Sequence, residues 1–278
     1  MKNINIYQFK NAGINLYTAF QNMKNSPFFS VLTASLNNGF TIEGTLESVK
    51  NQSFQNFEHI VIDGDSRDET LDILKKYKNA YNLTWISEPD LGISDALNKG
   101  LGLSYGRYII VIQADDQLLH PNILDNVFLQ LKSEKFDIIS FPIILNHPAK
   151  GKTFSKPIQH LWWNHFKFVF PHQGCFVHRR VFDQIGMFRN EFKICLDYDF
   201  FYRVLARNCS VKFGKFPVAL TGGEGVSTNT EFILKRLKEE RLVHILNEKN
   251  VLWKIAQSIF HTLYVPYKRL TLPNNISQ

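Results

Sequence analysis

The first 150 residues alternate short apolar runs with segments of helical periodicity, and this order constrains the fold more than any other feature. Apolar runs typical of buried strands occupy 28–34, 59–63, 83–86 and 107–113. Helical patterns lie between them at 42–50, 66–78 and 94–103. Strands that alternate with helices pair in parallel, because each helix returns the chain to the same end of the sheet. We therefore expect an α/β domain built on a parallel sheet.

The second half of the chain lacks this regular alternation. Residues 142–173 carry proline, lysine, histidine and tryptophan without clean periodicity, which predicts a loop-rich excursion that acts as a lid or acceptor region. A strand at 174–178 and a short helix at 180–185, closed by Gly186, should follow. Further helices are expected at 197–207, 231–247 and 251–270, the last interrupted by Pro266.

Polar side chains follow three of the expected strands at the point where each strand ends. Thr33 and Ser35 close the first strand, Asp63 closes the second, and Asp115 and Asp116 follow the fourth. The carboxyl ends of parallel strands point into a common crevice, where open α/β sheets bind ligands. A single strand-end aspartate often only caps a helix, but three polar ends on one edge favour a binding site.

The adjacent carboxylates Asp115 and Asp116 allow two interpretations. They can offer hard oxygen ligands to Mg²⁺ or Mn²⁺, which keep several waters and take further ligands from phosphates. Such an ion would offset the charge that develops when a diphosphate leaves. Alternatively, the pair belongs to a solvated turn that caps the helix starting at Pro121.

Asp63 also has two roles open to it, because a glycine-containing turn follows directly. Its carboxylate could accept a hydrogen bond from a nucleotide base, or it could organise the turn. Beyond the turn, Ser66 and Glu69 have the spacing of a capping box, which predicts that the next helix opens at Ser66.

Asp197 lies at the start of an expected helix, where the helix dipole favours a carboxylate. It can also act as a general base that accepts the proton of an attacking hydroxyl. Arg203 does not share its helical face and is expected to pair with Asp199, with a phosphate contact as the alternative. His172, followed by Gln173, is either structural or a hydrogen-bond donor to a phosphate or an acceptor hydroxyl.

Several classes of protein are excluded. No strand is followed by the glycine-rich signature of a dinucleotide-binding fold or a P-loop. The three cysteines are odd in number and form no Cys-x-x-Cys pair, so we expect free thiols in a reducing compartment rather than disulfides or a zinc knuckle. We recognise no secretory signal and no apolar run long enough to span a bilayer.

The positive charge is concentrated near the C-terminus. From residue 235 onward the chain has eight Lys or Arg against three Glu, so this segment carries five of the seven net positive charges. Apolar and aromatic side chains accompany the charges, namely Trp253, Ile259, Phe260, Leu263 and Tyr264 near Lys254, Lys268 and Arg269. The segment could lie on an anionic surface, or it could form helices packed against the rest of the protein.

Five stretches between residues 28 and 222 resemble one known family. They are SVLTASLNNGFTIEGTLESVKNQSFQNFEHIVIDGDSRDETLDIL, ISEPDLGISDALNKGL, GRYIIVIQADDQLLHPNIL, PHQGCFVHRRVFDQIGMF and LDYDFFYRVL. In this order they resemble glycosyltransferase family 2, inverting enzymes with the GT-A fold, and in particular bacterial members that build capsule or O-antigen polysaccharide. The resemblance implies a Rossmann-like, mostly parallel sheet flanked by helices over 28–222, after an N-terminal extension at 1–27 and before a basic helical extension at 223–278.

The resemblance implies roles for residues on the donor side. Thr33, Ser35 and Asp63 would hold the nucleoside, with Asp63 reading the base. Asp95 and Asn98 match the helix start beneath the diphosphate.

The resemblance also implies the metal and acceptor residues. Asp115 matches the metal-binding carboxylate of the family's Asp-x-Asp motif, with Asp116 as its neighbour in the donor site, and so implies Mn²⁺ or Mg²⁺. Asp197 matches the general base, and His172 and Gln173 would line the acceptor side.

The implied activity is transfer of a sugar from a nucleotide-diphosphate sugar, most commonly a UDP-sugar, to a hydroxyl of a glycan or lipid-linked acceptor in surface polysaccharide biosynthesis. We expect a cytoplasmic protein that is peripheral to an anionic membrane at the inner face of the plasma membrane, and no nucleic-acid partner. Gln113 and Leu196 stand where the family has Asp and Glu. These departures leave open a non-catalytic module of the same fold that binds sugar nucleotides or polysaccharide.

Overall fold

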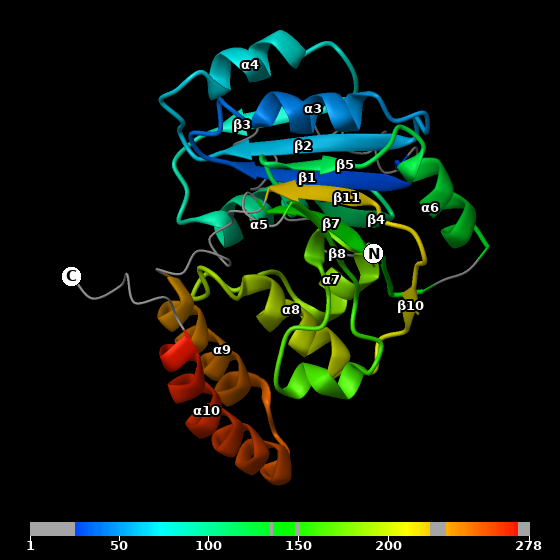
Figure 1. Ribbon diagram of the computed structural model, residues 1–278. Helices are drawn as coiled ribbons and strands as arrows, with labels where there is room; N and C mark the ends of the chain where they lie inside the picture. Colours follow the sequence, from blue (N-terminus) through cyan, green and yellow to red (C-terminus); the bar gives the residue numbers. More distant parts are fainter. Residues whose placement is uncertain (1–25, 134–135, 148–150, 223–231, 272–278) are drawn as a thin grey trace.

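A seven-stranded sheet forms the centre of the protein (Figure 1). The computed structural model describes residues 26–133, 136–147, 151–222 and 232–271. In spatial order the strands are β10 (Val211–Phe213), β6 (Ile138–Ser140), β9 (Cys175–His178), β4 (Tyr108–Val111), β1 (Phe29–Ser35), β2 (Phe57–Asp63) and β3 (Leu83–Ser87). Strand β9 is antiparallel to both of its neighbours, and the other pairs are parallel. The expected α/β fold with a mostly parallel sheet is confirmed.

Helices cover both faces of this sheet. The helices α3 (Ile42–Lys50), α4 (Thr70–Tyr77) and α5 (Ile93–Leu103) follow the first three strands, and α6 (Ile123–Leu131) comes after β4. Alternate residues of a strand point to opposite faces. Accordingly Val61 of β2 packs with α3 and α4, whereas Ile60 and Ile62 pack with α5. Helices α3 and α4 lie on one side of the sheet and α5 on the other (Figure 1).

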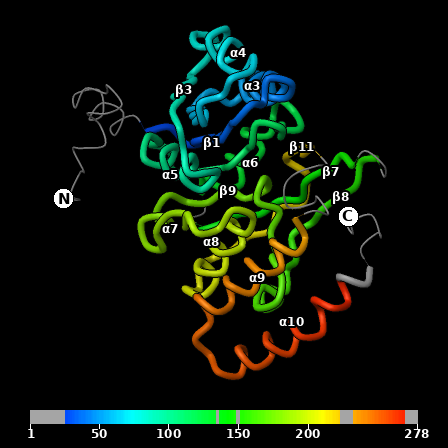
Figure 2. The backbone as a smooth tube through the Cα atoms, turned by 90° about the vertical axis from the view of Figure 1, so that its left-hand side faces the viewer, coloured from blue at the N-terminus to red at the C-terminus, as the bar shows by residue number. Residues whose placement is uncertain are grey.

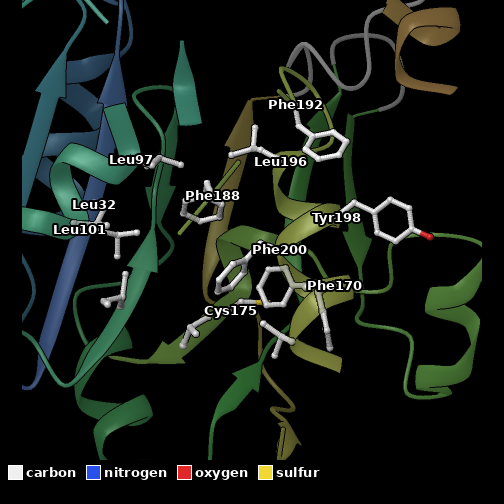
Figure 3. Close-up of a cluster of buried hydrophobic side chains, with 14 of the residues drawn as sticks. Leu32, Leu97, Leu101, Phe170, Cys175, Phe188, Phe192, Leu196, Tyr198 and Phe200 are labelled. Atoms are coloured by element: carbon white, nitrogen blue, oxygen red, sulfur yellow. The ribbon is translucent and has the colours of Figure 1, made fainter. Parts of the chain in front are cut away.

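The largest hydrophobic core joins the α5 face of the sheet to two later helices, α7 (Arg179–Ile185) and α8 (Leu196–Leu205). Leu32, Leu97 and Leu101, from β1 and α5, face a group of aromatic rings that includes Phe188 and Phe200 (Figure 3). These side chains are nearly or completely buried. The core therefore fixes α8 against the strands that begin the chain.

Residues 142–173 are not the loop-rich excursion that their composition predicts. They contain β7 (Ile143–His147) and β8 (Gly151–Ser155), which form an antiparallel hairpin in a second sheet of strand order β5–β11–β7–β8. The other members are β5 (Asp116–Leu118) and β11 (Ala219–Gly222). Strand β7 pairs in parallel with β11, far away in the sequence, so a local pattern does not reveal the pairing. The 3-10 helices η1 (Leu161–His165) and η2 (His172–Gly174) complete this segment.

Two expected helix boundaries also differ in the structure. Helix α4 begins at Thr70 rather than Ser66, because the Ser66 hydroxyl bonds to Asp63 and accepts from the backbone of Asn37 instead of capping the helix. Helix α10 (Val251–Thr271) continues through Pro266 without interruption. Pro266 is exposed, so water can reach the carbonyl group that its missing N–H leaves free.

The C-terminal helices pack against α8 rather than standing apart. Helix α9 (Ile233–Asn247) lies alongside α8, and α10 lies outside α9 (Figures 1 and 2). A buried chain of hydrogen bonds joins the three helices: Tyr198 Oη lies 2.6 Å from His244 Nε2, and His244 Nδ1 lies 2.8 Å from His261 Nε2. Within the described ranges, no helix is both long and apolar enough to cross a membrane.

Gly106→Ala should destabilise the protein by about 1–3 kcal/mol, the usual cost of overpacking. A Cβ atom at buried Gly106 would overlap the backbone of Phe29 and Ser30 in β1. Gly100→Ala is the matched control, because a Cβ there makes only ordinary contacts of 3.5 Å or more within a helix. Chemical denaturation of both variants checks this, and equal stabilities would contradict it.

Candidate active site

One cavity of about 980 Å³ lies at the carboxyl ends of β1 and β4. It also extends along α8 and the β7–β8 hairpin and reaches the C-terminal helices. Its polar lining at the strand ends and at α8 comprises Ser35, Asn38, Asp90, Gln113, Asp115, Asp116, His172, Gln173, Lys193 and Asp197. A volume of this size accommodates a ligand as large as a nucleotide sugar.

The strand register explains why these side chains meet. In the parallel pairing Ser35 lies opposite Asp63, and Leu32 lies opposite Val111, the last residue of β4. The chain then turns sharply, with the backbone N–H of Asp116 donating to the carbonyl of Gln113 at 3.0 Å. The Gln113 side chain accepts from the backbone N–H of Ala34 at 3.2 Å, so it ties this turn to the end of β1.

The two adjacent carboxylates of this turn have different environments. Asp116 is 2% exposed and points inward, where its Oδ2 accepts from the backbone N–H of Gln113 at 3.1 Å. Burial, and then repulsion from Asp115, raise the pKa of Asp116 to about 7. Asp115 is exposed at the cavity. The structure thus assigns the turn-organising role to Asp116 and leaves Asp115 available to a ligand.

The donor set fits a divalent cation that is held mainly by its substrate. The described residues contain no group of three or more His, Cys, Asp or Glu side chains that could enclose a metal ion. Mg²⁺ and Mn²⁺ need no such cage, because they bind through one or two carboxylates together with water and phosphate oxygens. Asp115 can supply one such carboxylate from the cavity wall.

Asp197 and His172 form a second pair of polar side chains in the cavity lining. His172 Nδ1 lies 3.2 Å from Asp197 Oδ2, and both side chains line the cavity. Burial opposes protonation of His172, but the hydrogen bond to Asp197 and the nearby charges of Asp197, Asp116 and Asp115 outweigh it and raise the histidine pKa. His172 Nε2 is buried and has no hydrogen-bond partner among the described residues. The pair therefore offers a carboxylate oxygen and an unused imidazole nitrogen side by side.

Two residues beyond Asp197, the buried carboxylate of Asp199 forms ion pairs that hold the start of α8. Asp199 is fully buried and receives Arg189 Nη1 and Arg203 Nε, each at 3.0 Å. Asn247 of α9 donates to the same carboxylate at 2.8 Å. The expected pairing of Arg203 with Asp199 is confirmed. These contacts anchor the first turn of α8 to the preceding loop and to α9.

Glu239 of α9 caps the amino end of α8 and is not indicated by the sequence. Its carboxylate accepts from three consecutive backbone N–H groups, those of Lys193, Ile194 and Cys195, at 2.8–3.2 Å. Helix starts have free N–H groups that require such partners. A residue of the C-terminal helices therefore fixes the backbone two residues before Asp197.

The structure does not bring every expected donor residue to the cavity. The Thr33 hydroxyl is buried and donates to the carbonyl of Ile112 at 2.6 Å. Asp63 is fully buried and accepts from the backbone and hydroxyl of Ser66 and from the hydroxyl of Ser87. Both residues shape the strand ends instead of lining the cavity. For Asp63, this arrangement is the turn-organising alternative.

Asp95 and Asn98 also serve the local fold. Asp95 accepts from the backbone of Leu91 at 3.1 Å, just before α5. Asn98 exchanges two hydrogen bonds with the backbone of Phe188, at 2.8 and 3.0 Å. Neither lines the cavity, whereas Gly92 and Ile93 at the start of α5 do.

The structure adds polar residues to the site that sequence reasoning missed. Asn38 follows β1 directly, and Asp90 lies in the stretch ISEPDLG that carries part of the family resemblance, so both had a local signal. Lys193 lies only three residues before α8, but no motif singled it out. Glu239 had no local signal, because only tertiary packing brings it to the segment before α8.

Comparison with known proteins agrees with this architecture. Residues 30–193 match the family described as Glycosyl transferase family 2, and the chain belongs to this family. It is a glycosyltransferase, as the named relatives below support.

Among relatives, a PGL/p-HBAD biosynthesis glycosyltransferase of Mycobacterium bovis is 28% identical over 178 residues, which cover 63% of this chain and 68% of the relative. The poly(ribitol-phosphate) beta-N-acetylglucosaminyltransferase TarP of Staphylococcus aureus is 33% identical over 132 residues, 46% of this chain and 39% of that protein.

Two solved structures share the fold. The structure of S. aureus TarS 1-349 in complex with UDP-GlcNAc has a TM-score of 0.67 and 18% identity, covering 87% of this chain and 74% of that one. The mannosyltransferase PcManGT of Pyrobaculum calidifontis, in complex with GDP-Man and Mn²⁺, has a TM-score of 0.64 and 15% identity, covering 95% and 81%. The GT-A fold expected from the sequence is thereby confirmed.

Asp116→Asn should stabilise the ligand-free protein at high pH. Because the pKa of Asp116 is raised from 3.8 to about 7, the folded protein keeps a proton that the unfolded chain loses in this range. Wild-type stability therefore falls as the pH rises through this window, and asparagine removes the loss. The variant should gain up to about 4 kcal/mol near pH 8 and little near pH 4 in chemical denaturation.

Asp115→Asn is the matched control for this pH dependence. Because the Asp115 side chain is exposed, its replacement should change the free energy of unfolding less than Asp116→Asn does. If Asp116→Asn gave the same change in stability at both pH values, the burial of an ionisable Asp116 would be contradicted.

Glu239→Ala should cost about 1–3 kcal/mol of stability, because it leaves buried N–H groups at the start of α8 without an acceptor. It should also lower kcat more than it raises the donor KM, since Asp197 lies two residues beyond the capped backbone. Glu239→Gln retains one carbonyl oxygen and should be intermediate. Lys238→Ala, at an exposed neighbour, should leave kcat and stability unchanged; losses equal to those of Glu239→Ala would contradict the capping role.

Proposed function

We propose that this glycosyltransferase moves a sugar from a nucleotide-diphosphate sugar to a hydroxyl group of a glycan or lipid-linked acceptor, with inversion at the anomeric carbon. The observation that carries the proposal is the shared cavity, lined by exposed Asp115 on one wall and by the Asp197–His172 pair on another. A cation-binding carboxylate and a base within one cavity are the groups that this reaction requires.

Asp197 takes the part of the general base. Its carboxylate can accept the proton of the attacking hydroxyl. The hydrogen bond from His172 Nδ1 orients the carboxylate through Oδ2, while Oδ1 accepts from the backbone of Tyr198 at 2.7 Å. We propose that His172 Nε2, which is buried and without a partner among the described residues, bonds an acceptor hydroxyl or a phosphate oxygen when substrate is bound.

Asp115 would hold Mn²⁺ or Mg²⁺ together with the donor diphosphate. The bound ion would supply positive charge to offset that of the leaving group. Lys193, which also lines the cavity, adds a cationic side chain near the start of α5, where its Nζ contacts the carbonyl of Leu91. The amino end of α5, beside Lys193, also favours the negative charge of a bound diphosphate.

A UDP-sugar is our first choice of donor, because the solved structure of TarS 1-349 contains UDP-GlcNAc. The PcManGT complex with GDP-Man makes a guanine nucleotide the second candidate. Relatives named for PGL/p-HBAD biosynthesis and for transfer to poly(ribitol-phosphate) support an acceptor on a glycoconjugate.

We further propose that residues 28–222 form the catalytic domain and that 223–278 extend it with the basic helices. Residues 1–27, proposed as an N-terminal extension, lie almost wholly outside the described residues. A cytoplasmic location, peripheral to the inner face of the plasma membrane, suits a nucleotide-sugar donor and the three free thiols.

Asp197→Asn should abolish transfer and spare donor binding, because the amide cannot take up the hydroxyl proton; a loss of at least about a hundredfold in kcat is expected. Thermal unfolding measured with UDP-, GDP- and dTDP-sugars in the presence of Mn²⁺ identifies the donor. A ligand at a hundred times its Kd adds about 2.7 kcal/mol to the free energy of unfolding. Product formation with a glycolipid acceptor then compares the variant with wild type.

Asp115→Ala is the companion variant and should lose the Mn²⁺-dependent part of the donor shift. Unchanged turnover in Asp197→Asn would refute the base assignment. A donor shift with neither transfer nor donor hydrolysis in the wild type would favour the non-catalytic binding module, whose only support in the sequence is the replacement of the family's Asp and Glu by Gln113 and Leu196.

A further inference from the structure

Helix α10 presents an apolar face to solvent along most of its length. Leu252, Ile255, Ile259, Leu263 and Tyr267 are each more than half exposed. At about 100° per residue these positions fall within one stripe roughly 120° wide, the width of a face that normally packs against another apolar surface. A soluble protein rarely leaves such a continuous stripe uncovered.

The opposite face of α10 already attaches the helix to the protein. Gln257 and His261 are buried there, and the Trp253 ring stacks on His165 with a centroid distance of 4.1 Å. Phe260 packs on Phe166, and Tyr264 stacks on Phe260 and lies beneath the Lys167 ammonium. Trp253, Phe260 and Tyr264, which the sequence suggested as surface-binding residues, therefore face inward. The exposed stripe is not needed to hold the helix in place.

The charge of this segment complements an anionic surface. After Glu248 the sequence has four basic residues, at 249, 254, 268 and 269, and no Asp or Glu. Lys249 and Lys254 are exposed, as are Lys238 and Arg241 on the neighbouring helix α9. An exposed apolar face on a helix with only positive charges is the pattern of helices that lie in the plane of a membrane containing anionic lipids.

We propose that the exposed face of α10 binds the surface of an anionic lipid bilayer, with the helix axis in the membrane plane. The inference rests on the proposed function in one respect, the choice of a lipid-linked acceptor. Tyr264, on the inward face of the same helix, lines the active-site cavity. One helix thus separates the cavity from the bilayer and places the cavity beside the membrane surface.

Vesicle flotation of the full chain, without donor or acceptor, tests the surface. Wild-type protein should float with vesicles of equal phosphatidylcholine and phosphatidylglycerol, and much less with phosphatidylcholine alone. The double variant Ile259→Glu with Leu263→Glu should reduce binding to the anionic vesicles by about tenfold or more, because it places two negative charges in the apolar stripe. Leu129→Glu, on the exposed face of α6, is the matched control and should float as wild type does.

Light scattering after size exclusion separates the bilayer from a protein partner. A wild-type dimer that the double variant converts to a monomer, without vesicle binding by either, would assign the face to a second copy and overturn the proposal. Flotation of the double variant at the wild-type level would overturn it too. Donor hydrolysis in solution should be equal in both proteins. If the wild-type protein floated with anionic vesicles but showed no glycosyl transfer, the proposed function would be refuted and the proposed membrane-binding face would not.

Discussion

Strand β1 lies between β2 and β4 with all three pointing the same way, and the rest of the molecule depends on this pairing. The register sets Ser35 beside Asp63 and ends β4 where the Gln113–Asp116 turn begins. One edge of the sheet therefore collects the polar strand ends. The alternate faces of these strands then recruit α3 and α4 on one side and α5 and α8 on the other.

Acidic side chains divide into two groups according to burial. Asp63, Asp116, Asp199 and Glu239 are buried and accept hydrogen bonds or ion pairs that hold turns and helix ends. Asp115 and Asp197 remain accessible at the cavity. Buried carboxylates are costly unless they are fully partnered. Asp63, Asp199 and Glu239 each accept several hydrogen bonds or ion pairs, whereas burial and the charge of Asp115 raise the pKa of Asp116 to about 7. The buried acidic residues thereby fix the backbone that positions Asp115 and Asp197 at the cavity.

Much of the central sheet could be predicted from the sequence, because apolar runs and helical periodicity are local properties of the chain. The β7–β8 hairpin could not be, since its pairing partner β11 is remote and its own pattern is weak. In the site, Asp115 and Asp197 stood out as strand-end and helix-start carboxylates. Asp63 looked equivalent from sequence, and only packing shows it turned into the fold by Ser66 and Ser87. Glu239 acts across helices, so no spacing reveals it.

The two C-terminal helices are hydrogen-bonded to α8 and to the segment just before it. The Tyr198–His244–His261 chain and the contact of Asn247 with Asp199 join α8 to α9 and α10, and Glu239 of α9 accepts from the backbone of residues 193–195. The same helices contribute Arg236, Glu240 and Tyr264 to the cavity wall. Exchange of this C-terminal segment between relatives would therefore affect the rest of the protein. It would replace part of the cavity wall together with the contacts that hold α8, so a substitute segment must supply both.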